Sequence, residues 1–189
     1  ASANSPYSWT PSATVAPAIA YTDMNSDILK IRLTSAGGIP VTDQSQNAFK
    51  IVGTISGIVP TGSGTLWNVG DNRNITWSQL GNIGAVDIYY RLSGGATPYD
   101  IPIVIEDTGH TNGSNSYAWN PVHDVNSEDV WVQVLDHNNA SILASSAASF
   151  KIRPVITVSA PTLNQQLTVG TNYPNLIKWS KTGTTIATV

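Results

Sequence analysis

Phe49-Lys50-Ile51 and Phe150-Lys151-Ile152 are two copies of one tripeptide, 101 residues apart. A Tyr-x-Trp-x-Pro stretch precedes each copy, at Tyr7–Pro11 and at Tyr117–Pro121. A Val-Gly pair and a Trp-Ser pair follow each copy: Val69-Gly70 with Trp77-Ser78, and Val169-Gly170 with Trp179-Ser180. Landmarks that recur at a fixed period indicate an array of similar structural units. Their order predicts the back half of one unit, one whole unit and the front half of a third.

These landmarks divide the 189 residues into three segments. We expect residues 1–50 to form the C-terminal part of one unit and residues 51–153 to form a complete unit of roughly 100 residues, the size of a small domain. Residues 154–189 then form the N-terminal part of a further unit. A window cut from a longer tandem array would have this organisation.

The composition excludes several classes of function. Charged residues make up only 11% of the chain, against about 25% in a typical globular domain. The net charge is −3 and no cluster of Lys and Arg is present, which argues against nucleic acid as a partner. The chain contains no Cys, so disulfides and Cys-bound metals are excluded.

The location of the protein is suggested by its polar residues, which are mostly Ser, Thr and Asn rather than charged side chains. Such a surface is typical of secreted proteins of prokaryotes, and we expect an extracellular or cell-surface location. No apolar run approaches the roughly 18 residues of a membrane span, so we expect no membrane span in this segment.

Short alternating runs between turn-rich stretches predict an all-β sandwich. In residues 85–92, alternation places Val86, Ile88, Tyr90 and Leu92 on one face. Pro102 favours an edge position for its strand. The strands expected in the complete unit cover residues 51–58, 74–77, 85–92, 101–105, 116–119, 130–134 and 147–152.

The partial units repeat this pattern. The apolar residues Leu29, Ile31 and Leu33 stand 101 positions before the apolar residues of segment 130–134. The first unit carries about nine extra residues, which we place in a loop over Pro11–Ser26, because insertions in repeats usually fall in loops. Only a few residues join Ile152 to the next expected strand, and such short linkers predict a stiff array.

The order of the landmarks resembles the fungal Kre9/Knh1-type domain of the Ser-Thr-rich, GPI-anchored membrane family. The resemblance implies immunoglobulin-like (Ig-like) β-sandwich domains in tandem, one complete and two partial, of the kind repeated in large cell-surface proteins. It implies no catalytic residue, and neither the family's GPI signal nor its Ser/Thr-only tail is found within these 189 residues. The resemblance rests on Pro60 and Gly64, Trp67–Gly70, Ile75–Trp77, Val86–Tyr90, Ser116–Pro121, Val130–Val134 and Phe150–Ile152.

Recurring aromatic residues on the apolar faces predict the core. Trp77 and Trp119 recur as Trp179 and Trp9 at the same places in the partial units, and recurrence at apolar positions indicates packing. We expect Trp77 to lie between the sheets, packed near Tyr90, Trp119 and Val132. The predicted structural core residues are Trp77, Tyr90, Trp119, Val132 and Phe150.

Two further tryptophans are candidates for a contact surface. Trp131 stands on the face opposite Val130 and Val132, where an exposed ring could stack on a sugar or bind a neighbouring molecule. Partial cover of Trp131 by the adjacent strand is an equal alternative. We also expect Trp67 to be partly exposed.

Candidate chemistry is sparse. His110, His123 and His137 lie in loops without the spacing of metal ligands, and solvated loop histidines are the simpler interpretation. The turns Asp71–Asn74 and Asp136–Asn139 are rich in oxygen atoms that would suit Ca²⁺ at domain junctions. Asx-turn chemistry explains them more simply. We therefore predict no metal site and no cofactor, with Ca²⁺ as the one candidate ion.

The sequence contains candidate modification sites but no catalytic motif. Asn112 and Asn139 head N-x-[ST] tripeptides in expected loops and are candidate glycosylation sites,. No nucleophile elbow is present, and the two glutamates, Glu106 and Glu128, do not form a hydrolase-like pair. The sequence therefore predicts a protein that is not an enzyme.

The leading hypothesis is a structural tandem-repeat module of an extracellular fibre, surface layer or giant adhesin. It would act as a stiff spacer and self-association unit, with neighbouring repeats or identical subunits of a filament as partners. The alternative is a cell-wall carbohydrate-binding module, in which Trp131 contacts a surface glycan.

Overall fold

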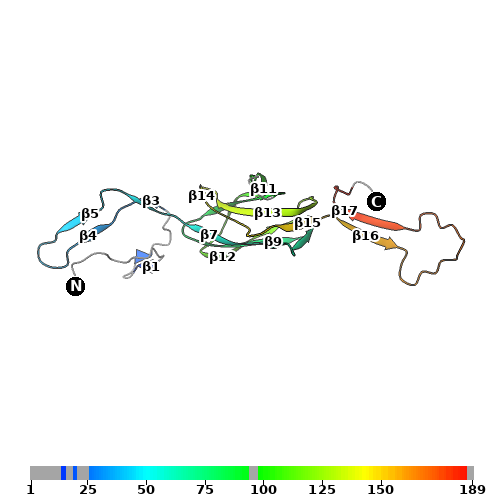
Figure 1. Cartoon of the computed structure of the whole chain (residues 1–189). Helices are drawn as coiled ribbons and strands as arrows, with labels where there is room; N and C mark the ends of the chain where they lie inside the picture. The colour runs from blue at the N-terminus through cyan, green and yellow to red at the C-terminus, as the bar shows by residue number, and fades with distance from the viewer. Residues whose placement is uncertain (1–13, 16–18, 21–25, 94–97, 187–189) are drawn as a thin grey trace.

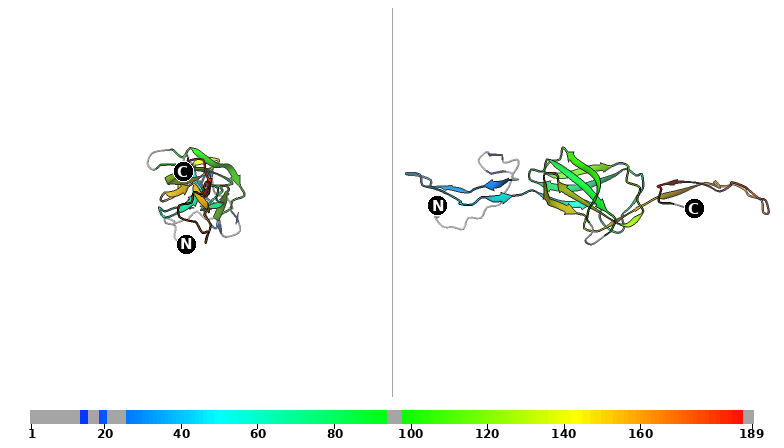
Figure 2. Two further views of the ribbon diagram at one scale, coloured as in Figure 1. Left: turned by 90° about the vertical axis from the view of Figure 1, so that its right-hand side faces the viewer. Right: turned by 90° about the horizontal axis from the view of Figure 1, so that it is seen from above.

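A computed structural model describes residues 14–15, 19–20, 26–93 and 98–186, and every regular element among them is a β-strand. Figure 1 shows a sandwich-like centre with a thin extension at each of two opposite ends, and the views of Figure 2 agree. We call residues 53–153 the central body, residues 26–51 the N-terminal arm and residues 155–186 the C-terminal arm.

One layer of the central body is a three-stranded antiparallel sheet in the order β12-β9-β7. Its strands are β7 (Thr54–Val59), β9 (Arg73–Leu80) and β12 (Gly113–Trp119). In β9, Ile75, Trp77 and Gln79 are buried while the residues between them are half-buried or exposed. This period of two places one face of the sheet in the core.

The other layer is a six-stranded sheet in the order β11-β10-β13-β15-β8, with β14 also paired to β13. β15 and β8 run parallel, whereas the other pairs in this layer are antiparallel. The strands are β8 (Leu66–Asn68), β10 (Ala85–Arg91), β11 (Ile101–Thr108), β13 (Ser127–Asp136), β14 (Asn139–Ser145) and β15 (Phe150–Arg153).

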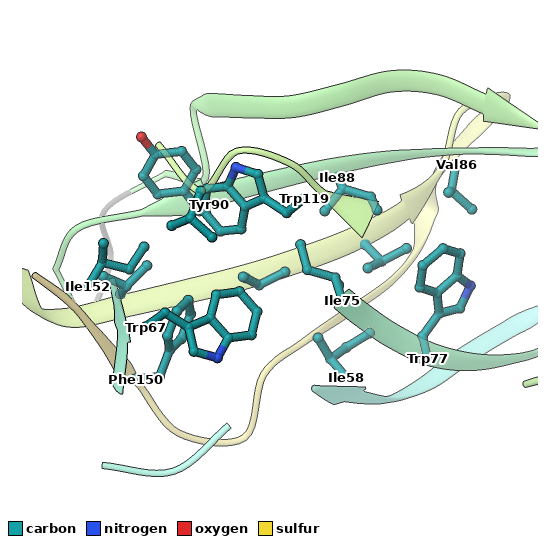
Figure 3. Packing of buried hydrophobic residues seen from close by; sticks show 14 of the residues in the cluster. Ile58, Trp67, Ile75, Trp77, Val86, Ile88, Tyr90, Trp119, Phe150 and Ile152 are labelled. Carbon is teal, nitrogen blue, oxygen red and sulfur yellow. The ribbon is translucent and has the colours of Figure 1, made fainter. Parts of the chain in front are cut away.

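The core lies between these two layers (Figure 3). Its buried hydrophobic residues all fall between Ile55 and Ile152. Trp67, Trp119 and Phe150 gather toward one end of the core, and Trp77 lies toward the other, beside Val86.

The N-terminal arm is built from two strand pairs. β3 (Ser26–Leu29) pairs with β6 (Phe49–Ile51), and β4 (Arg32–Thr34) pairs with β5 (Thr42–Gln44). Earlier in the chain, β1 (Thr14–Val15) pairs with β2 (Ile19–Ala20) inside the segment expected to be a loop. The expected counterpart of β12, Tyr7–Pro11, lies outside the described residues.

The pairing of the N-terminal arm reproduces that of the central body at a shift of 101 residues. Leu33 lies opposite Asp43, and Val134 lies opposite Ala144. The hydrogen bonds around this pair also recur. Ser45 N donates to Ile31 O at 2.8 Å and Ile31 N to Ser45 Oγ at 3.2 Å, and Ser146 and Val132 form the same two bonds at the same distances.

The C-terminal arm is a hairpin of β16 (Val155–Ala160) and β17 (Lys178–Thr182). It reproduces the β7–β9 pair. Ile156 lies opposite Lys181 as Ile55 lies opposite Gln79, and both pairings contain a register shift farther along. The shift relative to the central body is 101 residues in the first strand and 102 in the second.

Several expected strand boundaries are wrong. The strand expected over residues 51–58 is divided between β6 and β7, because the chain passes from the arm into the body at Gly53, which packs against Leu80 O. Leu92 falls beyond the end of β10 and is exposed. The expected edge position of the strand that contains Pro102 is confirmed, because β11 ends the sheet order.

Candidate functional site

The most unusual feature of the surface is the apolar character of the two arms. Of the 20 exposed large hydrophobic residues of the described chain, 14 lie outside the central body. Ile31 is 48% exposed, Leu33 73%, Ile177 65% and Trp179 46%. Contiguous exposed apolar side chains of this kind mark association surfaces in soluble proteins.

The exposed residues of the arms stand at the positions of core residues in the central body. Leu33 corresponds to Val134, and Trp179 corresponds to Trp77, and both body residues are almost fully buried. The arms therefore present faces that are already patterned for a sandwich core, without the opposite layer that covers the same faces in the body.

The C-terminal arm contacts the central body through a small polar site. Asp124, in the loop after β12, accepts hydrogen bonds from Thr184 N at 2.6 Å and Thr184 Oγ1 at 2.5 Å. The hydrogen bond from the Thr184 side chain, followed by that from its backbone N–H, lowers the pKa of Asp124. The preceding Gly183 has a φ of +103° and lies against Pro154, where a Cβ atom would approach within 2.8 Å of the proline ring. Only glycine fits this close contact at a positive φ.

The five predicted core residues are buried inside the sandwich. Their exposed fractions range from 0% for Phe150 and Val132 to 4% for Tyr90. The expectation that Trp77 packs near Tyr90 and Trp119 is wrong, because β9 carries Trp77 to the opposite end of the core (Figure 3). There its ring meets the ring of His110, with centroids 4.7 Å apart, and its Nε1 donates to Gln79 Oε1 at 3.1 Å.

Trp67 is not a surface residue. It is 7% exposed and belongs to the core cluster, on β8, which pairs in parallel with β15. The ring packs edge-on against Trp119 at 6.0 Å and at a tilt against Phe150 at 4.9 Å. Edge-on and tilted contacts are favoured arrangements for aromatic pairs.

Trp131 lies on the outer face of β13 and is half-buried. The guanidinium carbon of Arg91 lies 5.3 Å from the Trp131 ring centre and 4.4 Å from that of Tyr99. Trp131 Nε1 donates to Asp129 Oδ1 at 2.7 Å. Arg91 thus contributes cation–π contacts with both rings, and the adjacent β10 gives Trp131 partial cover.

The three histidines occupy different settings. His110 Nε2 lies 2.8 Å from Asp107 Oδ2, and His137 Nδ1 lies 2.8 Å from Asp87 Oδ1. The hydrogen bond to Asp87 raises the pKa of His137. His123 packs against the Trp119 ring at 5.2 Å, and burial lowers its pKa. Asp87 also accepts from Glu106 N at 2.8 Å, so its carboxylate ties β10 to β11 and to the β13–β14 turn.

The two oxygen-rich turns have local partners. Asp71 forms an ion pair with Arg73 at 2.8 Å, and this hydrogen bond lowers the pKa of Asp71. Asp136 accepts from Asn138 N at 3.0 Å, as in an Asx turn,. Within the described ranges, no group of three His, Cys, Asp or Glu residues is placed to hold a metal ion.

The two candidate glycosylation sites differ in accessibility. Asn112 is exposed in the loop before β12. Asn139 is half-buried at the start of β14, and its Oδ1 accepts a hydrogen bond from Ser141 Oγ at 2.6 Å. The Asn139 side chain is therefore already engaged with the serine of its own tripeptide.

Comparisons with protein-family models, with curated proteins and with solved structures gave no match for this chain. Among the described residues, no helix has the length and apolar character needed to cross a membrane.

Proposed function

We propose that this chain is a structural tandem-repeat module of an extracellular fibre, surface layer or giant adhesin, built from Ig-like units and acting as a stiff spacer. One observation carries the proposal: the strand registers of both arms coincide with those of the central body, down to the paired hydrogen bonds of Ile31 with Ser45 and of Val132 with Ser146. A tandem array of equivalent units accounts for this coincidence.

The stiffness follows from the junction between the body and the C-terminal arm. β15 ends at Arg153 and β16 begins at Val155, so a single proline separates two consecutive units. Asp124 and Pro154 contact the Gly183–Thr184 turn of the next unit. A proline linker with side contacts restricts rotation, and the array therefore holds a fixed direction.

An extracellular setting is supported by composition. Charged residues are few, and the polar residues are mostly Ser, Thr and Asn. The resemblance to Kre9/Knh1-type domains favours the same location. In this setting the units set the distance between a cell and whatever the protein carries.

Small-angle scattering of the full 189-residue chain tests the spacer proposal. A compact domain of this length would have a radius of gyration of about 16 Å. We expect a clearly larger value and an extended pair-distance distribution, with a compact cross-section. A compact particle with one deep pocket would overturn the proposal.

A carbohydrate-binding module is the second candidate, and the outer-face group of Trp131, Asp129 and Tyr99 favours it. An aromatic ring beside a carboxylate is suited to stack on a sugar and to accept hydrogen bonds from its hydroxyls. Binding to wall polysaccharides that is lost in Trp131→Ala and kept in Lys151→Ala would support this candidate. It ranks second because the Arg91 guanidinium already lies over the Trp131 ring.

A further inference from the structure

We propose that the C-terminal arm of one copy of this chain docks onto the N-terminal arm of a second copy, and that the two arms form the opposing layers of one sandwich. The inference deepens the proposed function, on which it rests, by naming the partner of the exposed arm faces. That partner is an identical chain, joined head to tail.

The C-terminal arm carries one layer of such a sandwich. Ile156, Ile177 and Trp179 are exposed by 46%, 65% and 46%, respectively. Their counterparts Ile55, Ile75 and Trp77 are exposed by 7%, 0% and 2% and form one side of the body's core.

A hydrogen bond from β9 to the loop that follows it has a counterpart in the C-terminal arm. Gln79 donates to the loop carbonyl Ile83 O at 3.0 Å. Lys181, at the same register position, donates to the loop carbonyl Ile186 O at 2.5 Å. In the arm, as in the body, a side chain of the second hairpin strand therefore donates a hydrogen bond to the loop that follows that strand.

The N-terminal arm carries the other layer. Ile31, Leu33 and Val41 are exposed by 48%, 73% and 70%. Their counterparts Val132, Val134 and Ile142 are exposed by 0%, 0% and 4%.

The central body shows how these two faces fit. Ile55, Ile75 and Trp77 belong to the same hydrophobic cluster as Val132, Val134 and Ile142, and β7 contacts β13 and β14, two strands of the other layer. The chain thus contains its own template of the proposed interface. Covering both arm faces removes from water the apolar area that they now expose, which is the main driving force of association.

The geometry favours a second copy over the arms of a single chain. The two arms leave the body at opposite ends (Figures 1 and 2), so they point away from each other. Because the two arm faces are different, each copy presents one N-terminal face and one C-terminal face for docking. Such heterologous contacts do not close on themselves and generate open filaments.

The joint is held by non-covalent contacts between separate chains, so its population depends on protein concentration, whereas the body folds within one chain. Dilution should separate the copies while the body stays folded.

Complementary variants of the full chain test the proposal. Leu33→Asp places a charge on the N-terminal face and leaves the C-terminal face intact, and Trp179→Asp does the reverse. We expect the parent chain to form a concentration-dependent series of oligomers in analytical ultracentrifugation. Each variant alone should associate at least about tenfold more weakly, because an unpaired charge in an apolar interface is costly.

The decisive sample is an equimolar mixture of the two variants. It contains only one competent pair of faces, so we expect dimers and no larger species. Matched controls place the same charge on the outer faces of the same strands, at Thr34→Asp and Ser180→Asp. These controls should assemble like the parent.

Three results would overturn the proposal: a parent chain that stays monomeric at all concentrations, single variants that assemble like the parent, or mixtures that grow beyond dimers. Thermal unfolding of the body and scattering of the monomer are recorded in parallel. An elongated monomer with a normal melting transition would reject the docking of a second copy and leave the spacer function standing. A compact monomer would reject the spacer function itself.

Discussion

Trp77 and Trp179 occupy the same register position in two equivalent hairpins, yet Trp77 is 2% exposed and Trp179 is 46% exposed. The difference lies in what faces each hairpin. Trp77 is covered by the six-stranded sheet of the central body, and the hairpin of Trp179 has no such layer among the described residues. One sequence pattern thus occurs both with and without its packing partner in a single chain.

Replacing Trp77 with alanine should destabilise the central body by about 3–5 kcal/mol, the usual cost of removing a large buried aromatic side chain. This is a large fraction of the stability of a small domain. The measurement is urea unfolding followed by far-UV circular dichroism. Trp179→Ala is the matched control and should leave the transition of the body within about 0.5 kcal/mol of the parent. Equal effects of the two substitutions would contradict the assigned packing.

Replacing Asp124 with alanine should loosen the C-terminal arm, because Thr184 N and Oγ1 lose their acceptor. The chain has no Cys, so two cysteines introduced at the exposed positions Asn112 and Asn164 can carry spin labels. We expect a narrow distribution of label distances in the parent and a broader one in Asp124→Ala. The control is Asp100→Ala, which removes an exposed carboxylate from the body. A distribution as narrow as in the parent would show that Asp124 does not hold the arm.

The pH dependence of stability should carry opposite contributions from two histidines. The pKa of His137 is raised by Asp87, so its stabilising contribution is complete below pH 6.5 and is lost as the pH rises through the folded-state value,. The pKa of His123 is lowered by burial, so protonation of the unfolded chain destabilises the fold as the pH falls below about 6.5,.

Melting temperatures between pH 5 and pH 8 test these signs. His137→Gln should lower the melting temperature more at pH 5 than at pH 8. His123→Gln should make the melting temperature fall less toward pH 5 than it does in the parent. Identical pH profiles for the parent and His137→Gln would contradict the role of the Asp87 pair.

Replacing Gly81 with alanine should destabilise the body by roughly 1–3 kcal/mol. Gly81 has a φ of +92°, and an added Cβ would lie 2.7 Å from Gly53 Cα. Gly84→Ala is the control, because a Cβ there meets no atom within 4 Å and the backbone lacks a positive φ. Thermal unfolding of both variants should separate them clearly, and a neutral Gly81→Ala would contradict this close approach.

The sequence was most informative where alternation and recurrence acted together. In β10, alternating apolar residues correctly predicted the buried face of Val86, Ile88 and Tyr90. β14 was missed because Ala and Ser, which are common in it, are weak strand formers and leave no alternating apolar pattern,. β8 was missed because it has only three residues and owes its pairing to the distant β15.

The candidate association surfaces were partly predictable. The exposure of Ile31 and Leu33 follows from a strand pattern without the rest of its unit, whereas Leu29 is half-buried. The polar contact between Asp124 and Thr184 joins residues 60 positions apart, and no local motif marks it. Trp67 was misassigned because a single aromatic residue in a short strand carries no periodicity that tells its inner from its outer face.

The parallel pairing of β15 with β8 has a mechanical consequence. The chain leaves the body from the end of β15, at Arg153, along the direction of the strand itself. Tension applied along the axis therefore pulls β15 lengthwise between β13 and β8. The hydrogen bonds on both sides of β15 are then loaded together in shear and are not broken one after another. β7 is pulled lengthwise against β9 at the opposite end. The central body should then resist stretching up to a high force and rupture abruptly.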